Sequence, residues 1–256
     1  MPTLVIQNQR LHYSEHGGDP EGRRRPLVLV HGAGGNLYHW PPTLRRLPGY
    51  DVYALDLPGH GHSQGPGRDA IAAYAGVVIA WADAVGLPSF VIAGHSMGGG
   101  IALTCALDYG QRVAGLILIG SAARLRVHPD ILAGLRDDRV AISARLVEWV
   151  YGPRATPEQK RQYGRLLLAA DIDTLLGDWL ACDRFDVRDR LAEVKAPTLI
   201  LTGALDVMTP PRAASFLAEH IAGADLTWLE GAGHMAQIEA PTLTAAAISG
   251  FLARLS

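Results

Sequence analysis

The sequence predicts an α/β protein whose mostly parallel, eight-stranded sheet is flanked by helices and interrupted by a helical insertion. Three observations lead to this prediction. Short apolar runs recur along the chain, helix-like segments separate most of them, and one gap of about seventy residues is too long to be a loop. The expected strands occupy residues 4–6, 11–14, 27–30, 52–55, 90–93, 115–119, 198–201 and 226–229. The first two have no helix between them, so we expect an antiparallel hairpin followed by parallel strands.

The long gap divides the chain into a core and an insertion. We expect residues 1–121 and 195–256 to form the core domain and residues 122–194 to form the insertion. With 256 residues, 48% of them hydrophobic, the chain is long enough for one large core and a modest insertion. Within the core, apolar side chains between residues 71 and 85 fall on one helical stripe, which predicts a helix packed on the sheet.

Four short helices are expected in the insertion: one after His128, one over residues 140–151, one from Thr156 onward, and one around residues 175–181. The third has the clearest beginning. Thr156 is a good capping residue, and the proline that follows it suits the first helical position.

Composition and charge exclude several classes of function. A formal net charge of −2 favours neither nucleic acid nor an anionic membrane as a partner. The two cysteines, Cys105 and Cys182, are too few for a disulfide framework, and no metal-ligand spacing is present, so we expect no metal and no other cofactor. The first residues lack a signal-peptide pattern and no apolar run is long enough to span a bilayer. We expect a cytoplasmic monomer or homodimer.

A candidate nucleophile follows the expected strand at residues 90–93. There the sequence reads Gly94-His95-Ser96-Met97-Gly98, the G-x-S-x-G pattern of a serine on a sharp turn between a strand and a helix. Glycines two residues either side avoid collisions at such a strained turn. The turn would expose the Ser96 hydroxyl and place the Met97 N–H at a helix N-terminus, facing a developing negative charge.

A serine hydroxyl needs a base and a group that orients the base, and the C-terminal third supplies both. Asp206 lies in the loop after the expected strand at 198–201, and His234 lies in the loop after the strand at 226–229. The order Ser96, Asp206, His234 is typical of one catalytic-triad scaffold. We expect His234 to take the proton from Ser96 and Asp206 to orient His234.

A glycine-rich loop, His31-Gly32-Ala33-Gly34-Gly35, follows the strand at 27–30. Its backbone N–H groups can point into a cavity without obstruction by side chains, and the Ala33 N–H is the expected second oxyanion donor beside that of Met97. A phosphate cradle is disfavoured because the loop has neither a G-x-x-x-x-G-K-S/T motif nor a full dinucleotide fingerprint. We expect His31 to shape the turn by hydrogen bonding to the backbone.

Taken together, H-G-A-G-G, D-L-P-G-H-G-H-S at residues 56–63, G-H-S-M-G-G and the loops carrying Asp206 and His234 resemble the α/β-hydrolase superfamily over nearly the whole chain. The resemblance implies the α/β-hydrolase fold and a helical cap formed by residues 122–194. In that superfamily the D-L-P-G-H-G-x-S segment mainly forms a tight turn, so we do not count Asp56, His60 or His62 as catalytic. The fold hosts many chemistries, so it does not define the substrate.

A cap of this kind would exclude water and form one wall of the substrate pocket. The candidate lining residues are Tyr38, Leu125, Trp149, Tyr151, Leu167, Trp179, Phe185, Val207 and Met235, together with Met97. They predict an apolar pocket with few charges. Arg124 and Arg126 follow the strand at 115–119 and could reach the pocket mouth, but we expect them to be solvated.

Hydrolysis of a small to medium carboxylic ester through an acyl-enzyme requires the least beyond these elements, and it is the predicted function. Enol-lactone hydrolases share G-x-S-M-G-G, whereas hydrolases of carbon–carbon bonds commonly carry Asn where this chain has His95. Dehalogenases and epoxide hydrolases of this fold use an aspartate nucleophile, and perhydrolases tend to have a bulky residue at the position of Ala33. A ligand receptor that keeps the triad is the alternative outside enzymes.

Overall fold

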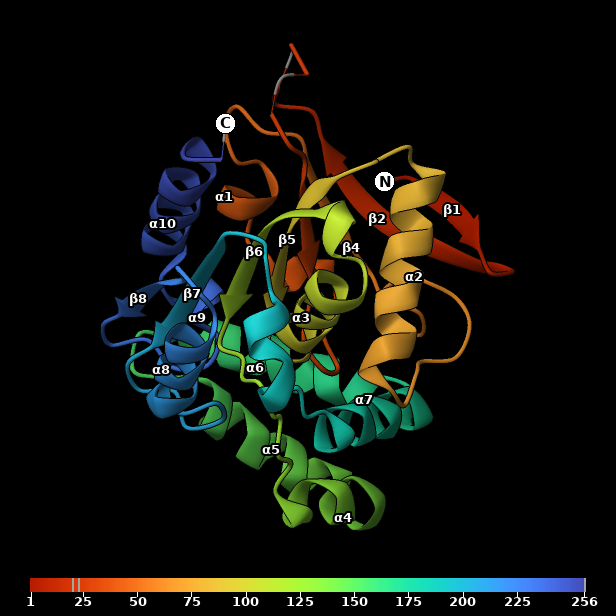
Figure 1. Ribbon diagram of the computed structural model, residues 1–256. Coiled ribbons are helices and arrows are strands. Elements are labelled where there is room, and N and C mark those ends of the chain that lie inside the picture. The colour runs from red at the N-terminus through yellow and green to blue at the C-terminus, as the bar shows by residue number, and fades with distance from the viewer. Residues whose placement is uncertain (20, 23, 256) are drawn as a thin grey trace.

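The computed structural model describes residues 1–19, 21–22 and 24–255 and has the predicted α/β architecture (Figure 1). Its strands are β1 (Thr3–Ile6), β2 (Gln9–His16), β3 (Leu27–Val30), β4 (Val52–Leu55), β5 (Phe90–His95), β6 (Val113–Ile119), β7 (Thr198–Gly203) and β8 (Asp225–Leu229). They form one eight-stranded sheet in the order β1-β2-β4-β3-β5-β6-β7-β8. β2 pairs antiparallel with β1 and β4, and all other pairs are parallel. The predicted fold class is confirmed.

Helices cover both faces of this sheet. The core helices are α1 (Pro42–Arg45), α2 (Ile71–Ala84), α3 (Met97–Asp108), α8 (Pro211–His220), α9 (Ala236–Glu239) and α10 (Pro241–Ala253), with short 3-10 turns η1 (Leu37–His39) and η2 (Gly110–Arg112). A further 3-10 turn, η3 (Arg188–Glu193), lies near the end of the segment between β6 and β7. Successive strand side chains point to opposite faces. Ile92 therefore packs in a core with α2, α3 and α8, whereas Ala93 packs in a second core with α1, α9 and α10.

The chain between β6 and β7 contains the four helices predicted for it. Within this described segment they are α4 (Pro129–Asp137), α5 (Arg139–Val150), α6 (Pro157–Ala169) and α7 (Ile172–Arg184). They share an apolar core that includes Met235 and packs against Ala33 and Met208. These three residues follow β8, β3 and β7, so the four helices lie over loops at the carboxyl ends of parallel strands.

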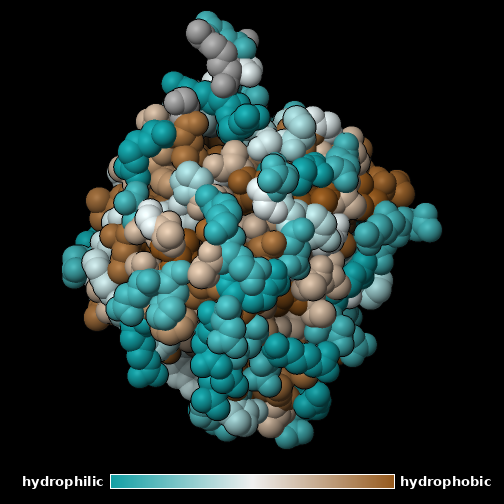
Figure 2. Space-filling model, viewed as in Figure 1, coloured by the Kyte–Doolittle hydropathy of each residue, from teal (hydrophilic) through white to brown (hydrophobic). Residues whose placement is uncertain are grey.

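On the face seen in Figure 2, the surface around α4 and α5 is largely hydrophilic. Figure 2 shows polar side chains predominating in the lower part of this view, where α4 and α5 lie in Figure 1, with hydrophobic residues in separate patches. Among the described residues, no helix has the length and apolarity needed to cross a membrane.

Candidate active site

Ser96 occupies a strained turn between β5 and α3. Its backbone has φ 53° and ψ −116°, a positive-φ conformation that residues other than glycine rarely adopt. The two flanking glycines make this turn possible: a Cβ on Gly94 would collide with the Gly98 backbone, and a Cβ on Gly98 would collide with the Val30 backbone. The Ser96 N–H is held by the Ile119 carbonyl at 2.9 Å. Gly94 and Gly98 thus allow the backbone conformation of Ser96 that this turn requires.

Asp206 and His234 are brought together from loops after β7 and β8. Asp206 Oδ2 lies 2.9 Å from His234 Nδ1, and both side chains are buried. Asp206 also accepts hydrogen bonds from the Met208 and Thr209 N–H groups and from the Thr209 hydroxyl, at 2.8, 2.9 and 2.8 Å. Burial opposes ionisation, but attraction to the protonated form of His234 and the hydrogen bonds from His234 and Thr209 lower the pKa of Asp206 below its ordinary value. Since a carboxylate only accepts, His234 carries its proton on Nδ1 and has Nε2 free to act as a base.

Ser96 and His234 line the same cavity, of about 340 Å³, which we call the Ser96 cavity. Within the part of the chain that the structure describes, no hydrogen bond joins the Ser96 hydroxyl to His234. Such contacts are often long without substrate and tighten when it binds.

His95, which the sequence analysis did not assign to the site, contacts both the ring and the backbone of His234. The two rings lie 4.8 Å apart, and His95 Nε2 donates to the His234 carbonyl at 3.0 Å. Burial, together with the charge of His234, lowers the pKa of His95 well below its ordinary value, so His95 stays neutral. Its position one residue before the nucleophile was the only available signal.

The glycine-rich loop after β3 lies beside Ser96. Ala33 lines a small inner cavity together with Ser96, His95 and His234. His31 shapes the loop as predicted: its Nδ1 donates to the Gly32 carbonyl at 2.8 Å, and its Nε2 accepts from the Leu57 N–H at 3.1 Å. The Met97 N–H begins α3 and has no acceptor inside that helix. Ala33 and Met97 thus both lie close to Ser96, as the prediction of two oxyanion donors requires.

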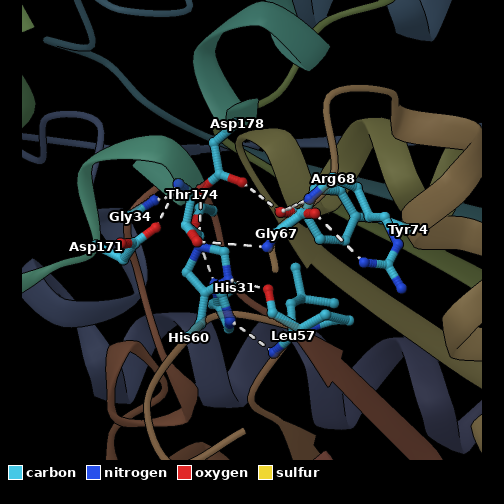
Figure 3. A network of polar contacts seen from close by, with 12 residues as sticks. His31, Gly34, Leu57, His60, Gly67, Arg68, Tyr74, Asp171, Thr174 and Asp178 are labelled. Atoms are coloured by element: carbon cyan, nitrogen blue, oxygen red, sulfur yellow. Dashed lines mark hydrogen bonds and ion pairs between the residues drawn. The ribbon is translucent and has the colours of Figure 1, made fainter. Parts of the chain in front are cut away.

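A buried polar network connects this loop to the insertion (Figure 3), and the sequence analysis did not predict it. Asp178 of α7 is fully buried, and its Oδ2 accepts from the Gly34 N–H and from His60 Nε2, both at 2.8 Å. Its Oδ1 accepts from the Tyr74 hydroxyl at 2.6 Å. Burial lowers the pKa of His60, but the charge of Asp178 together with the hydrogen bonds to Asp178 and Pro58 raises that pKa above its ordinary value. His60 also donates to the Pro58 carbonyl, so it binds as a cation.

Asp56 is a structural residue, as expected. Its carboxylate accepts from the Leu37 N–H at 2.7 Å, from the His62 N–H at 2.9 Å and from His12 Nδ1 at 2.7 Å. These contacts close the turn after β4 and hold it against β2. None of them faces the Ser96 cavity.

Five of the ten predicted lining residues lie at a cavity. Leu125 and Trp179 line the Ser96 cavity, and Met235 lines the inner cavity. Trp149 and Val207 line a neighbouring outer cavity of about 470 Å³, which shares Trp179 and Met208 with the Ser96 cavity. Met208 lines all three cavities and was missed, because one methionine in a loop carries no distinctive signal.

The other candidates lie elsewhere. Tyr38 is 51% exposed and its ring stacks on Arg45, so its assignment to the pocket was wrong. Tyr151 and Leu167 are buried in the core of the insertion rather than at a cavity. Phe185, and the Met97 side chain, are likewise buried, in the core that contains α3.

The expectation of a pocket with few charges was also wrong. Four arginines line the Ser96 cavity, namely Arg124, Arg126, Arg188 and Arg212. The first two are exposed, as expected, but they border the cavity as well. Arg188 and Arg212 were missed because they come from other segments, η3 and α8. Among the described residues, no group of three or more histidine, cysteine or carboxylate side chains is placed to hold a metal ion.

The fold and this arrangement define a hydrolase of the α/β type. The chain belongs to the alpha/beta hydrolase family, whose model matches residues 27–247. A pimeloyl-(acyl-carrier protein) methyl ester esterase of Serratia marcescens is 32% identical over 208 residues, 75% of this chain and 80% of that protein.

Solved structures agree with this assignment. A thermophilic esterase shares 28% identity with a TM-score of 0.87, covering 100% of this chain and 98% of its own. An enol-lactonase from Burkholderia xenovorans LB400 has a TM-score of 0.91 over 98% of this chain and 100% of its own, and at 24% identity it supports the fold alone.

Proposed function

We propose that the protein is a serine esterase that hydrolyses small to medium carboxylic esters through an acyl-enzyme. Ser96 is the nucleophile, His234 the general base and Asp206 the group that orients His234. The observation that carries this proposal is the Asp206–His234 pair, 2.9 Å apart and buried, at a cavity that also contains a serine in a strained turn. Similarity to a methyl ester esterase supports the ester bond as the target.

The mechanism follows from these positions. His234 Nε2 removes the proton from Ser96 as its Oγ attacks the ester carbonyl, and the oxyanion that forms accepts hydrogen bonds from the Ala33 and Met97 N–H groups. Collapse of this intermediate expels the alcohol, which takes its proton from His234. Water then attacks the acyl-enzyme with His234 again as the base, releasing the acid.

We further infer that residues 122–194 act as a cap on a core of residues 1–121 and 195–256. Trp149 and Trp179 come from this segment and line the outer and Ser96 cavities. Its packing against Ala33, Met208 and Met235 supports this role, because these residues belong to the loops that carry the site. A cap in this position would bound the substrate and exclude water.

Turnover of p-nitrophenyl acetate and butyrate tests the proposal. We expect repeated turnover by the wild type and a loss on the order of 10⁶-fold in kcat for Ser96→Ala. Ser215→Ala, on α8, is the matched control and should keep wild-type rates. Substantial turnover by pure Ser96→Ala would refute the assignment of Ser96 as the nucleophile. A single stoichiometric burst of product from the wild type would indicate a ligand receptor rather than an enzyme. A lactone and a carbon–carbon ring-fission substrate assayed alongside distinguish the other hydrolase chemistries.

A further inference from the structure

The Ser96 cavity carries a concentration of positive charge. Its four arginines come from separate segments: Arg124 and Arg126 follow β6, Arg188 lies on η3 and Arg212 on α8. Asp186 forms ion pairs with two of them, at 3.6 Å from Arg124 and 2.7 Å from Arg188. The chain as a whole has a formal net charge of −2, so this cluster is opposite in sign to the protein that bears it.

The other two arginines have no acidic partner. Within residues 1–19, 21–22 and 24–255, neither Arg126 nor Arg212 forms an ion pair. The catalytic carboxylate does not neutralise them either, because Asp206 is buried and is engaged by His234 and Thr209. In the insertion and η3, ion pairs are formed by Arg145, Arg161, Arg184 and Arg190, whereas the exposed Arg136 and Arg165 have none among the described residues. At the Ser96 cavity, the two guanidinium groups that no carboxylate of the described chain compensates are those of Arg126 and Arg212.

We propose that this site takes esters bearing a carboxylate remote from the scissile bond, and that Arg126 and Arg212 bind that carboxylate. The inference rests on the proposed esterase function and names its substrate class. A guanidinium group donates two parallel hydrogen bonds to a carboxylate and stays charged at every relevant pH. The cavity, of about 340 Å³, suits a small acid ester, with Leu125, Trp179 and Met208 as apolar contacts for its methylene chain.

Two methyl esters that differ only in charge test the proposal: methyl hydrogen adipate, with a terminal carboxylate, and methyl adipamate, with a terminal amide. We expect the wild type to prefer the carboxylate by about tenfold or more in kcat/KM at low ionic strength, as charge-assisted hydrogen bonds imply. The preference should shrink in about 0.5 M salt, where exposed charges are screened over a few ångströms.

Substitution of the two arginines locates the effect. In the double variant Arg126→Gln with Arg212→Gln, the ratio of kcat/KM for the two esters should fall toward one. Arg10→Gln, on β2 beside the edge strand β1 and far from the Ser96 cavity, also removes a positive charge and should leave the ratio unchanged. A wild-type ratio near one at low salt, or a double variant that keeps the wild-type ratio, would overturn the proposal.

Binding to the Ser96→Ala variant separates this inference from the esterase proposal. Calorimetric titration should show methyl hydrogen adipate binding more tightly than methyl adipamate, and the difference should disappear when both arginines are replaced. If neither ester is hydrolysed by the wild type while this binding difference is seen, the esterase proposal fails and the carboxylate site stands. If both esters are hydrolysed equally well and bind equally well, the carboxylate site fails alone.

Discussion

Replacing Asp178 with alanine should destabilise the protein strongly. The substitution leaves three buried donors without an acceptor: the Gly34 N–H, His60 Nε2 and the Tyr74 hydroxyl. His60 would also lose the negative charge that compensates it in a site where it is almost fully buried. Removing one member of a buried ion pair typically costs ~3–5 kcal/mol, so we expect the free energy of unfolding to fall by that amount.

The same substitution should slow catalysis through the glycine-rich loop. Gly34 adjoins Ala33, whose N–H we assign to the oxyanion hole, and Asp178 is the group that holds the Gly34 N–H. Loss of a whole oxyanion donor costs roughly 10²–10³-fold in kcat, and a loosened donor should cost less, about tenfold. Because Asp178 acts through the loop, it is a positioning residue, and kcat should fall more than KM rises.

Urea unfolding and ester hydrolysis, both measured where the variants remain folded, test this reasoning. Asp171→Ala is the matched control. Asp171 caps the same helix by accepting from the Thr174 N–H at 2.8 Å, and its loss should cost about 1 kcal/mol without changing kcat. Asp178→Asn, which keeps the shape of the side chain, should fall between the wild type and Asp178→Ala. A loss of stability below about 1 kcal/mol for Asp178→Ala, or an equal fall in kcat for Asp171→Ala, would refute the assignment.

Three further predictions concern the base, the cavities and acid stability. Asp206→Asn should stay folded but lose roughly 10⁴-fold in kcat, since an amide no longer orients His234 as the base; an unchanged rate would place the acid elsewhere. Trp179→Ala should raise the relative kcat/KM for longer acyl esters by more than Trp149→Ala, because only Trp179 borders the Ser96 cavity; equal chain-length profiles would contradict this. Burial, with a smaller effect of His60, lowers the pKa of His39 to about 4. As the pH falls below about 6.5, His39 therefore becomes protonated in the unfolded chain but stays neutral in the folded state. His39 should thus lower the free energy of unfolding by about 2 kcal/mol between pH 7 and pH 5. Urea unfolding of the wild type and of His39→Gln at both pH values tests this. Between pH 7 and pH 5, the variant should lose about 2 kcal/mol less unfolding free energy than the wild type.

The sheet and the order of the candidate triad could be predicted because their signals are local. β5 is buried on both faces, so its sequence is apolar from Phe90 to Ala93, and the glycines around Ser96 are required by clashes within a few residues or with the adjacent strand. Asp206 and His234 each follow a strand, and the carboxyl ends of parallel strands meet at one edge of a sheet. A short sequence pattern was therefore enough to predict that distant loops converge.

The Asp178 network could not be predicted in this way. Asp178 lies 144 residues from Gly34 and 118 residues from His60 along the chain, and it sits on a helix whose other polar residues are mostly solvated. An aspartate in a helix normally indicates the exposed face. Only the packing of α7 against the loop after β3 reveals that this one is buried and paired.

The arginine cluster shows a second limit of sequence reasoning, and it bears directly on specificity. Net charge and local charge patterns average over the chain, so an overall charge of −2 conceals four guanidinium groups at one cavity. Arg124 and Arg126 taken alone fit a solvated loop, and Arg212 at the start of α8 fits a solvated helix face. Their proposed common function depends on three connections that converge on the same cavity as Ser96. The candidate triad is thus predictable from short motifs, whereas the proposed substrate preference depends on residues that only the assembled fold places together.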